Sequence, residues 1–285
     1  MRTMLAARLH AIGAPLQIDS LPVPQPAPTD VLIEVKACNL VPNVKNVLTK
    51  VRPDKPLPDL PASFGLDAAG IVAEVGSEVI AIRPGDRVYA MAGMGCGSCR
   101  ACRTGEEINC RSFTYRGYFG RGPIARRILQ RYPYGGLSQF LTAPQALLVK
   151  LPDKVGFEEA SRFGYLGTAY SALRKANVGP ARSVLVNAAG GTLGLGTVLL
   201  ALAMGASKVL GTGRNPLLLD RVKALSPGRI EVMSVRDNPR TIRDWALSLT
   251  DGEGVDAVID ALPPGTPSGA TMAALRALRV GGRAV

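Results

Sequence analysis

The 285-residue sequence has little histidine, little cysteine and no long apolar run. Its longest apolar stretch, around residues 198–204, is far shorter than the roughly 20 residues that a membrane-spanning helix needs. Only five cysteines are present, and four of them crowd between Cys96 and Cys110. Crowded thiols suit a metal site in a reducing compartment better than a secreted disulfide framework. The lack of a long apolar run and the few, clustered cysteines together predict a cytoplasmic protein with no membrane partner.

The first 18 residues lack acidic side chains, so a targeting peptide is an alternative interpretation of this segment. Residues 4–12 nevertheless have the pattern of a first strand, which we favour. The only histidine, His10, lies in that stretch and is interpreted as a bystander.

The formal net charge of +12 raises the question of a nucleic-acid partner. One local excess of arginine runs from Arg111 to Arg131 and is interleaved with phenylalanine and tyrosine. Such a segment can bind single-stranded nucleic acid or an anionic small molecule. More often it is a solvated insertion whose aromatic side chains anchor it to the core. This interpretation predicts no nucleic-acid partner.

Two patterns divide the chain into a β domain over residues 1–150 and an α/β domain over residues 151–285. Before residue 150, short strands such as 31–37, 70–75 and 87–91 are broken by proline and glycine turns, as in a β-barrel. Later, apolar strands alternate with helices, which predicts a doubly wound parallel sheet covered on both faces. These strands are expected at 183–188, 208–211, 230–234 and 255–262, and the helices at 158–175, 193–204, 216–225, 239–249 and 266–278.

The first strand of that sheet runs into Asn187-Ala-Ala-Gly-Gly-Thr-Leu-Gly-Leu-Gly196 and then into a helix. Glycines in this context let the backbone approach a pyrophosphate, which faces the amides at the helix N-terminus. A tight turn with no ligand is the alternative. The dinucleotide interpretation predicts six cofactor-binding residues here: Ala188, Gly190, Gly191, Thr192, Leu193 and Gly194.

The tip of the next strand, Gly211-Thr-Gly-Arg-Asn215, carries no carboxylate. NAD-binding units usually place Asp or Glu there to hold the ribose 2′-hydroxyl, and a carboxylate would repel a 2′-phosphate. Gly213 leaves room for that phosphate, Thr212 and Arg214 can bond it, and Asn215 completes the predicted cofactor set. The tip therefore favours NADP(H) over NAD(H).

The cysteines Cys96, Cys99, Cys102 and Cys110 follow the spacing C-x2-C-x2-C-x7-C, which is typical of a metal knuckle. Two disulfides are the alternative, although cysteines three residues apart are poorly placed to bridge. The fifth cysteine, Cys38, is interpreted as a packing residue.

This order of a barrel-like half, a cysteine knuckle and a dinucleotide-binding half resembles the medium-chain dehydrogenase/reductase superfamily of zinc-containing alcohol dehydrogenases and quinone reductases. The similarity covers essentially the whole chain, with matching stretches at Val31–Cys38, Phe64–Gly70, Pro84–Val88, Tyr134–Phe140 and Thr168–Tyr170. It implies a GroES-like β-barrel domain with a structural-zinc loop over residues 91–111, then a Rossmann domain with Thr168 at the cofactor. In this family the four thiolates close a tetrahedron around zinc and leave no position for substrate. The glycine turn resembles the quinone-reductase branch, which often uses NADPH.

The sequence departs from the family at the catalytic zinc. The positions of its cysteine, histidine and second cysteine fall on Val41, Leu66 and either Gly164 or Tyr165, none of which ligates zinc. Asn43 stands where the family's proton relay usually has a hydroxyl residue. The resemblance therefore implies hydride transfer without a catalytic metal.

Without a Lewis acid, the expected small-molecule substrates are already activated: enones, quinones, iminium ions or reactive aldehydes. Tyr165 is the leading candidate for a proton or oxyanion donor, with simple packing as its alternative. Asn43 and Lys45 are further candidates, and Asp67, which replaces the family's glutamate, is either catalytic or structural. Three aromatic residues are candidates for the apolar wall of the substrate cleft: Tyr118, Phe119 and Tyr134.

The segment Arg279-Val-Gly-Gly-Arg-Ala-Val285 predicts a helix end, a glycine turn and the start of a strand. Family members continue with further strands that usually form the dimer contact, so the chain resembles a truncated member, and a homodimer is expected only if it is complete. Our prediction is an NADP(H)-dependent reductase with one structural zinc. A conventional alcohol dehydrogenase and a non-catalytic dinucleotide-binding protein are the alternatives.

Overall fold

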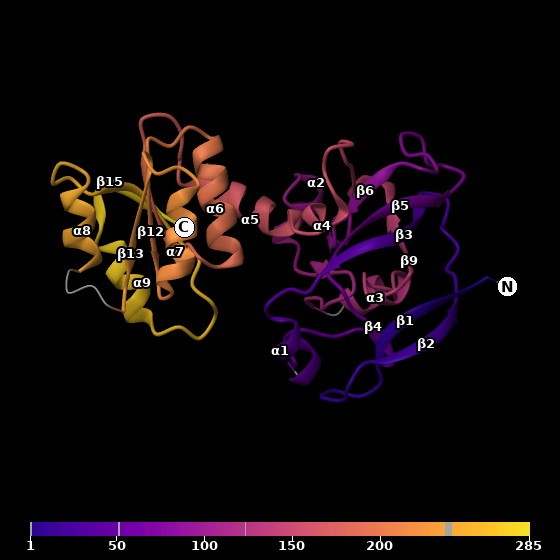
Figure 1. The fold of residues 1–285 in the computed structure, drawn as a ribbon. Coiled ribbons are helices and arrows are strands. Elements are labelled where there is room, and N and C mark those ends of the chain that lie inside the picture. The colour runs from indigo at the N-terminus through magenta and orange to yellow at the C-terminus, as the bar shows by residue number, and fades with distance from the viewer. Residues whose placement is uncertain (1, 51, 123, 237–240) are drawn as a thin grey trace. The chain divides into compact units, whose positions relative to one another are not determined.

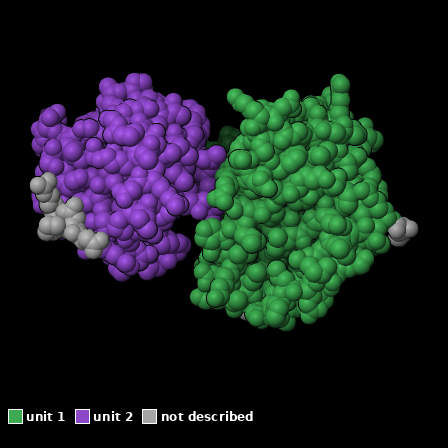
Figure 2. Space-filling model, in the orientation of Figure 1, with its two compact units in different colours: residues 1–164 green, residues 165–285 purple. Residues whose placement is uncertain are grey.

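The computed structural model describes residues 2–50, 52–122, 124–236 and 241–285. The chain folds as two compact units, residues 1–164 and residues 165–285 (Figure 2). No helix within these described ranges is long and apolar enough to cross a membrane.

The first unit is built from antiparallel strands (Figure 1). Its larger sheet has the order β10-β6-β5-β3-β9, with β3 at Asp30–Asn39, β5 at Asp67–Val75, β6 at Arg87–Ala90, β9 at Phe140–Pro144 and β10 at Leu148–Lys150. The smaller sheet has the order β2-β1-β4, with β1 at Thr3–Leu9, β2 at Gln17–Pro22 and β4 at Ala62–Ser63. The antiparallel pair of β7 (Gly93–Met94) and β8 (Thr114–Tyr115) flanks the cysteine segment. The short helices are α1 at Val44–Thr49, α2 at Arg100–Arg103, η1 at Glu107–Asn109, α3 at Ala125–Arg131, η2 at Gln145–Leu147 and α4 at Phe157–Ala160.

The second unit contains a parallel sheet with the order β13-β12-β11-β14-β15. Its strands are β11 at Ser183–Asn187, β12 at Lys208–Gly213, β13 at Ile230–Ser234, β14 at Val255–Asp260 and β15 at Leu278–Ala284. The helices are α5 at Phe163–Lys175, α6 at Thr192–Ala203, α7 at Pro216–Ala224, α8 at Ile242–Ser248 and α9 at Ser268–Leu275. The strand order reverses beside β11, which is the topological switch point where open α/β sheets bind ligands. The predicted order, a β half followed by a half with a parallel sheet, is confirmed.

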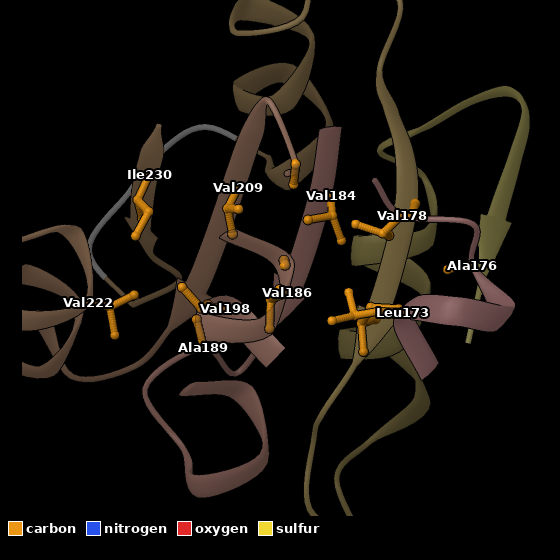
Figure 3. Packing of buried hydrophobic residues seen from close by; sticks show 14 of the residues in the cluster. Leu173, Ala176, Val178, Val184, Val186, Ala189, Val198, Val209, Val222 and Ile230 are labelled. Atoms are coloured by element: carbon orange, nitrogen blue, oxygen red, sulfur yellow. The ribbon is translucent and has the colours of Figure 1, made fainter. Parts of the chain in front are cut away.

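Side chains of β11 are buried on both faces of the parallel sheet. Successive residues of a strand point to opposite faces. Val184 and Val186 of β11 pack in one cluster with Val198 of α6 and Leu173 of α5 (Figure 3). Leu185, between the two valines, packs in the cluster on the other face. Because both faces are covered at β11, the three consecutive residues Val184, Leu185 and Val186 are all apolar.

Three helix or strand predictions need correction. The helix predicted at 158–175 is interrupted after Ala160, where the Ser161 hydroxyl donates to the Glu158 carbonyl, 2.7 Å away. The helix predicted at 266–278 ends at Leu275. The glycine turn predicted near the end of the sequence is an irregularity inside β15, with Gly281 at a φ of 74°. Residues 239 and 240 of the predicted helix 239–249 lie outside the described residues.

Candidate functional site

The four cysteines of the predicted knuckle come together in the first unit. Their Sγ atoms all lie within 4.8 Å of one another, and those of Cys99 and Cys102 are 3.6 Å apart. Sulfurs around tetrahedral zinc, with Zn–S near 2.3 Å, lie about 3.8 Å apart. Gly95 permits this convergence, because a Cβ there would lie 2.5 Å from the Cys102 sulfur. All five cysteines of the chain are free thiols, so the geometry does not support the disulfide alternative.

Backbone amides surround the clustered sulfurs. The N–H groups of Cys96 and Ser112 each lie 3.4 Å from the Sγ of Cys110 as donors. Hydrogen bonds from the backbone of Ser98 and Cys99 lower the pKa of Cys96 to about 6, whereas burial and the neighbouring Cys99 and Cys110 thiols raise the pKa of Cys102 to about 12. Donors of this kind favour the thiolate form, which is the form that binds metal. The cluster therefore fits a zinc ion in both spacing and chemistry.

The glycine-rich turn joins β11 to α6 in the second unit. Ala188 adopts a left-handed conformation with a φ of 63°, which turns the chain sharply after the strand. A Cβ on Gly194 would lie 2.1 Å from the Ala188 carbonyl oxygen, so only glycine allows α6 to pack this closely on the turn. Gly191 is the N-cap of α6 and offers no side-chain acceptor to its first amides. Those amides, which begin at Thr192, are the groups that bind an anion at a helix N-terminus.

A hydrogen-bond network fixes the ends of three strands beside that turn. The Thr212 hydroxyl of β12 donates to the side-chain oxygen of Asn187, 2.7 Å away. The Asn187 amide donates in turn to Asp260 at the end of β14, at 3.1 Å, and the Thr271 hydroxyl donates to the same carboxylate at 2.6 Å. The sequence interpretation missed this network, although three polar residues at apolar strand ends were a visible signal.

The tip of β12 carries the residues predicted to select the cofactor. Arg214 is exposed, and a Cβ on Gly213 would lie 3.1 Å from the side chain of Leu219. Asn215 caps α7, its side-chain oxygen accepting from the amide of Leu218 at 3.4 Å. Thr212 is fully buried and its hydroxyl is used by Asn187. The geometry therefore gives no support to a phosphate contact from the Thr212 hydroxyl.

Asp67 begins β5 and is almost completely buried. The Tyr89 hydroxyl donates to its Oδ1 at 2.6 Å, and a Cβ on Gly164 would lie 2.6 Å from the same oxygen. Burial raises the pKa of Asp67, while the Tyr89 hydrogen bond and the charge of Arg116 act in the opposite direction. The sequence interpretation did not single out Tyr89, since nothing in a short apolar strand marks one tyrosine as a donor.

Arg116 is fully buried in the first unit, which corrects its assignment to a solvated basic run. Its Nη2 donates to the Ala90 carbonyl at 3.2 Å, and its Nε and Nη1 have no hydrogen-bond partner among the described residues. Burial lowers the pKa of Arg116 to about 10, opposed by Tyr89, Tyr132 and Asp67, so the guanidinium remains charged at neutral pH. The buried guanidinium of Arg116 therefore interacts electrostatically with the buried carboxyl group of Asp67.

Other residues of the basic and aromatic segment are also used inside the first unit. Arg126 pairs with Asp59, and Arg131 lies 3.6 Å from Asp30. The rings that could stack on bases are buried, namely Phe113, Tyr118, Phe119 and Tyr132. The segment therefore presents few of its rings to a nucleic acid.

The predicted catalytic residues are divided between the two units. Asn43 is the N-cap of α1 and accepts from the Asn46 amide at 2.9 Å, and Lys45 is exposed on the same helix. Tyr165, half-buried on α5, and the exposed Thr168 belong to the second unit. Within the first unit, Cys38 is a partly buried thiol whose pKa burial raises to about 12, as expected for a packing residue.

Comparison with known proteins places this geometry in a family. The alcohol dehydrogenase GroES-like domain model matches residues 27–153. An NAD-dependent alcohol dehydrogenase of Sulfurisphaera tokodaii is 31% identical over 264 residues, which cover 90% of this chain and 71% of that protein. The L-idonate 5-dehydrogenase of Vitis vinifera is 31% identical over 271 residues, covering 94% of this chain and 69% of that protein. The chain belongs to the zinc-type alcohol dehydrogenase superfamily.

A solved structure supports the membership. The crystal structure of an NAD-dependent alcohol dehydrogenase superposes with a TM-score of 0.81 at 30% identity, covering 99% of this chain and 76% of that one. The chain is thus an oxidoreductase of this superfamily, with a GroES-like domain followed by a Rossmann-like sheet, as the sequence predicted.

Metal-ligating groups in this alcohol dehydrogenase-type chain gather at one place. Among the residues that the structure describes, the only group of three or more convergent His, Cys, Asp or Glu side chains is the four-cysteine cluster. The resemblance to the family predicts that Val41 and Leu66 occupy positions of its catalytic-zinc ligands, and neither side chain can ligate zinc. The absence of a catalytic zinc stays a prediction.

Proposed function

We propose that this oxidoreductase transfers hydride between NADP(H) and an activated carbonyl, enone or quinone-type small molecule, without a catalytic zinc. The observation that carries the proposal is the tip of β12, where Gly213 and the exposed Arg214 stand in place of the usual carboxylate. An arginine there can bind a 2′-phosphate through charge-assisted hydrogen bonds.

The turn after β11 would hold the pyrophosphate of the dinucleotide. Gly190 and Gly191 keep side chains away from the turn, and the uncapped first amides of α6, at Thr192, Leu193 and Gly194, would donate to the phosphate oxygens. When bound, the nicotinamide supplies or accepts the hydride. The Asn187–Thr212–Asp260 network would hold the surrounding strand ends in place.

Tyr165 is proposed as the group that gives a proton or a hydrogen bond to the oxygen on which negative charge develops. Asn43 would orient the substrate by hydrogen bonds, because an amide does not act as an acid or base near neutral pH. Lys45 would add a positive charge on the same helix. Asp67, bound by Tyr89, is proposed as a residue that fixes the local structure.

The four cysteines would hold one structural zinc. Four thiolates complete the tetrahedral coordination, so such a site shapes the segment between β7 and β8 and binds no substrate. This role agrees with the convergence of the four sulfurs.

A conventional NAD-dependent alcohol dehydrogenase is the second candidate, favoured by the names of relatives such as the Sulfurisphaera tokodaii protein. A titration of the protein with NADPH and NADH, followed by reduced-nicotinamide fluorescence, separates the two. We expect tighter binding of NADPH, then chelator-insensitive oxidation of NADPH by enones or quinones. Oxidation of a simple alcohol by NAD that a chelator abolishes would overturn the proposal. Tight NADPH binding with no turnover of any substrate would favour a non-catalytic dinucleotide-binding protein.

A further inference from the structure

A small pocket of the first unit lies beside α1 and the segment that follows this helix. Two of its lining residues, Val47 and Phe119, are buried and apolar. Three cationic side chains also line it, namely Lys50, Arg52 and Lys55. The pocket has a volume of about 20 Å³, and one water molecule needs about 10–15 Å³. It therefore accommodates one small chemical group.

Positive charge predominates at this pocket. No acidic side chain is among the described residues that line it. Arg52 is paired with Asp54, its Nη2 lying 3.3 Å from the Oδ2 of that residue. Lys50 and Lys55 make no ion pair with a described residue, and both reach solvent. Two uncompensated ammonium groups attract an anion and repel a cation.

The Phe119 ring positions one of these ammonium groups. The Nζ of Lys55 lies 4.9 Å from the centroid of the ring, which is a cation–π contact. The ring itself is held by an edge-on contact with Tyr115, at 5.6 Å between the ring centroids. Because Phe119 lines the pocket, the Lys55 ammonium is held beside the pocket. A cation that is already in place loses less side-chain freedom when it binds an anion.

Two exposed asparagines, Asn43 and Asn46, add hydrogen-bond donors to the same pocket. The Oδ1 of Asn43 accepts from the Nδ2 of Asn46 at 2.9 Å, which orients both amides. The two hydrogens on the Nδ2 of Asn43 bond to no described residue, and a ligand can reach them. The pocket thus combines N–H donors with ammonium groups, and both kinds of group bind oxygen atoms that carry negative charge.

We propose that this pocket binds the carboxylate or phosphate group of a small molecule, and that the substrate of the reductase carries such a group. Lys50 and Lys55 compensate the anion, and the Asn43 amide donates to the carbonyl oxygen of the same molecule. That this molecule is the substrate rests on the proposed function, in which Asn43 orients the substrate. Anion binding itself does not, because every lining residue belongs to the first unit and none to the dinucleotide-binding unit.

Levulinate (4-oxopentanoate), titrated into the 285-residue chain without dinucleotide and followed by saturation-transfer NMR, tests the anion site. Its methyl ester has the same ketone without the charge. We expect levulinate to bind at least about tenfold more tightly than the ester at low salt, the factor that one charge-assisted hydrogen bond contributes. The difference should shrink at about 0.5 M salt, which screens exposed charges. Acetol phosphate carries a phosphate in place of the carboxylate, and the tighter of the two anions identifies the group that the pocket prefers.

The double variant Lys50→Gln/Lys55→Gln should weaken levulinate binding by about tenfold, since each exposed ion pair contributes about threefold. Lys36→Gln/Lys154→Gln removes two charges at exposed lysines outside the pocket and should change nothing. Equal affinity for levulinate and its ester, or an unaffected Lys50→Gln/Lys55→Gln variant, would overturn the site. In the unmodified protein, levulinate should shift the ε-methylene resonances of Lys50 and Lys55, and unmoved resonances would exclude the site.

Turnover separates a failure of this inference from a failure of the proposed function. The test substrates are the enone 4-oxopent-2-enoate and its methyl ester, with NADPH oxidation as the readout. The ratio of kcat/KM for the acid to that for the ester should fall by about tenfold in Lys50→Gln/Lys55→Gln, and the intrinsic reactivities of the two enones cancel in this comparison. Turnover of both enones with an unchanged ratio would overturn the inference and leave the reductase in place. Turnover of neither, with levulinate bound at the two lysines, would refute the reductase and the substrate assignment but support the anion site.

Discussion

Tyr89 and Asp67 are joined by a 2.6 Å hydrogen bond inside the first unit, with the phenol as the donor. Tyr89 pairs with Ala69 in the register of β5 and β6, and Asp67 lies two residues before Ala69 on the same strand. Both side chains therefore lie on one face of the sheet, as diagonal neighbours. Burial raises the pKa of Tyr89 far above its ordinary value, so the phenol stays a donor at every ordinary pH.

Tyr89→Phe removes the hydroxyl that donates to Asp67. We expect the free energy of unfolding to fall by about 1–3 kcal/mol, the cost of leaving a buried acceptor unpaired. The pKa of Asp67 should rise further, because the hydrogen bond favours the ionised form. Since the folded pKa is already raised, ionisation costs stability as pH rises above the unfolded value of about 3.9, and the variant should lose stability more steeply with rising pH.

Urea unfolding at several pH values measures both effects of Tyr89→Phe. Tyr170→Phe is a matched control, because Tyr170 is 47% exposed and should change stability by no more than about 0.5 kcal/mol. Equal stability of the two variants would show that the Asp67 hydrogen bond contributes nothing.

Zinc content tests the cysteine cluster. Protein purified under reducing conditions should carry one zinc per chain, and Cys110→Ser should lose it together with stability. Cobalt substitution should give the thiolate-to-metal absorption of a tetrahedral sulfur site. Cys38→Ser serves as the control and should keep the zinc. Two zinc ions per chain would contradict the predicted absence of a catalytic metal.

Gly213→Asp tests the choice of dinucleotide. A carboxylate at the tip of β12 should repel the 2′-phosphate and accept from a ribose hydroxyl. We expect the ratio of NADPH to NADH affinity to fall by at least about tenfold, or about 1.4 kcal/mol. Arg214→Ala should lower the same ratio, whereas Arg221→Ala, at an exposed arginine of α7, should not. An unchanged ratio in both tip variants would remove the basis for NADP(H).

Gly194→Ala tests the close approach of α6 to the turn. The added methyl would lie 2.1 Å from the Ala188 carbonyl oxygen, so helix or turn must shift. We expect a loss of stability of about 1–3 kcal/mol and weaker dinucleotide binding. Gly269→Ala on α9 is the control, because its methyl meets no atom within 4 Å and should stabilise the protein by about 0.4–1 kcal/mol. Thermal unfolding and the fluorescence titration report the two effects, and unchanged behaviour of Gly194→Ala would refute the packing argument.

Asp256 should control the acid stability of the second unit. Burial alone would raise its pKa, but hydrogen bonds from the Ser183 amide, Arg182 and Arg279 lower it well below its ordinary value. The contribution of this carboxylate to the free energy of unfolding is therefore fully present above the unfolded pKa of about 3.9. It is lost as the pH falls through the folded pKa.

Asp256→Asn should reduce the free energy of unfolding by about 2–4 kcal/mol at pH 7, because two arginines lose their charged partner. The same variant should show a flatter decline of stability below about pH 4 than the unmodified protein. Denaturant unfolding from pH 3 to 7 measures both, with Asp220→Asn as an exposed control. Parallel acid profiles for Asp256→Asn and the unmodified protein would contradict this account.

The sequence predicted the parts of the fold that local pattern determines. Val184 to Val186 form an uninterrupted apolar run that only a strand buried on both faces requires, and the glycines at 190, 191 and 194 mark the turn that follows. The cysteine spacing likewise predicted the convergence of four sulfurs. Each of these signals lies within about 15 consecutive residues, where spacing alone restricts the geometry.

Other features depend on segments distant in sequence. Arg116 sits in a basic run that looks solvated, yet it is buried beside Ala90, 26 residues away. Tyr89 reaches Asp67 over 22 residues, and only the pairing of β5 with β6 makes them neighbours. Local propensity contains no information about such pairs, because tertiary packing decides them.

The central place of β11 in its sheet has a consequence for synthesis on the ribosome. β11 meets β12 about 25 residues later, but its bond to β14 spans 73 residues, between Ser183 and Asp256. At roughly 5–20 residues per second, the roughly 48 residues between these two partners take about 2–10 s to synthesise, and for that time one edge of β11 has unpaired backbone N–H and C=O groups. During that interval the nascent chain offers an open strand edge to other chains, which makes it a natural client for a chaperone.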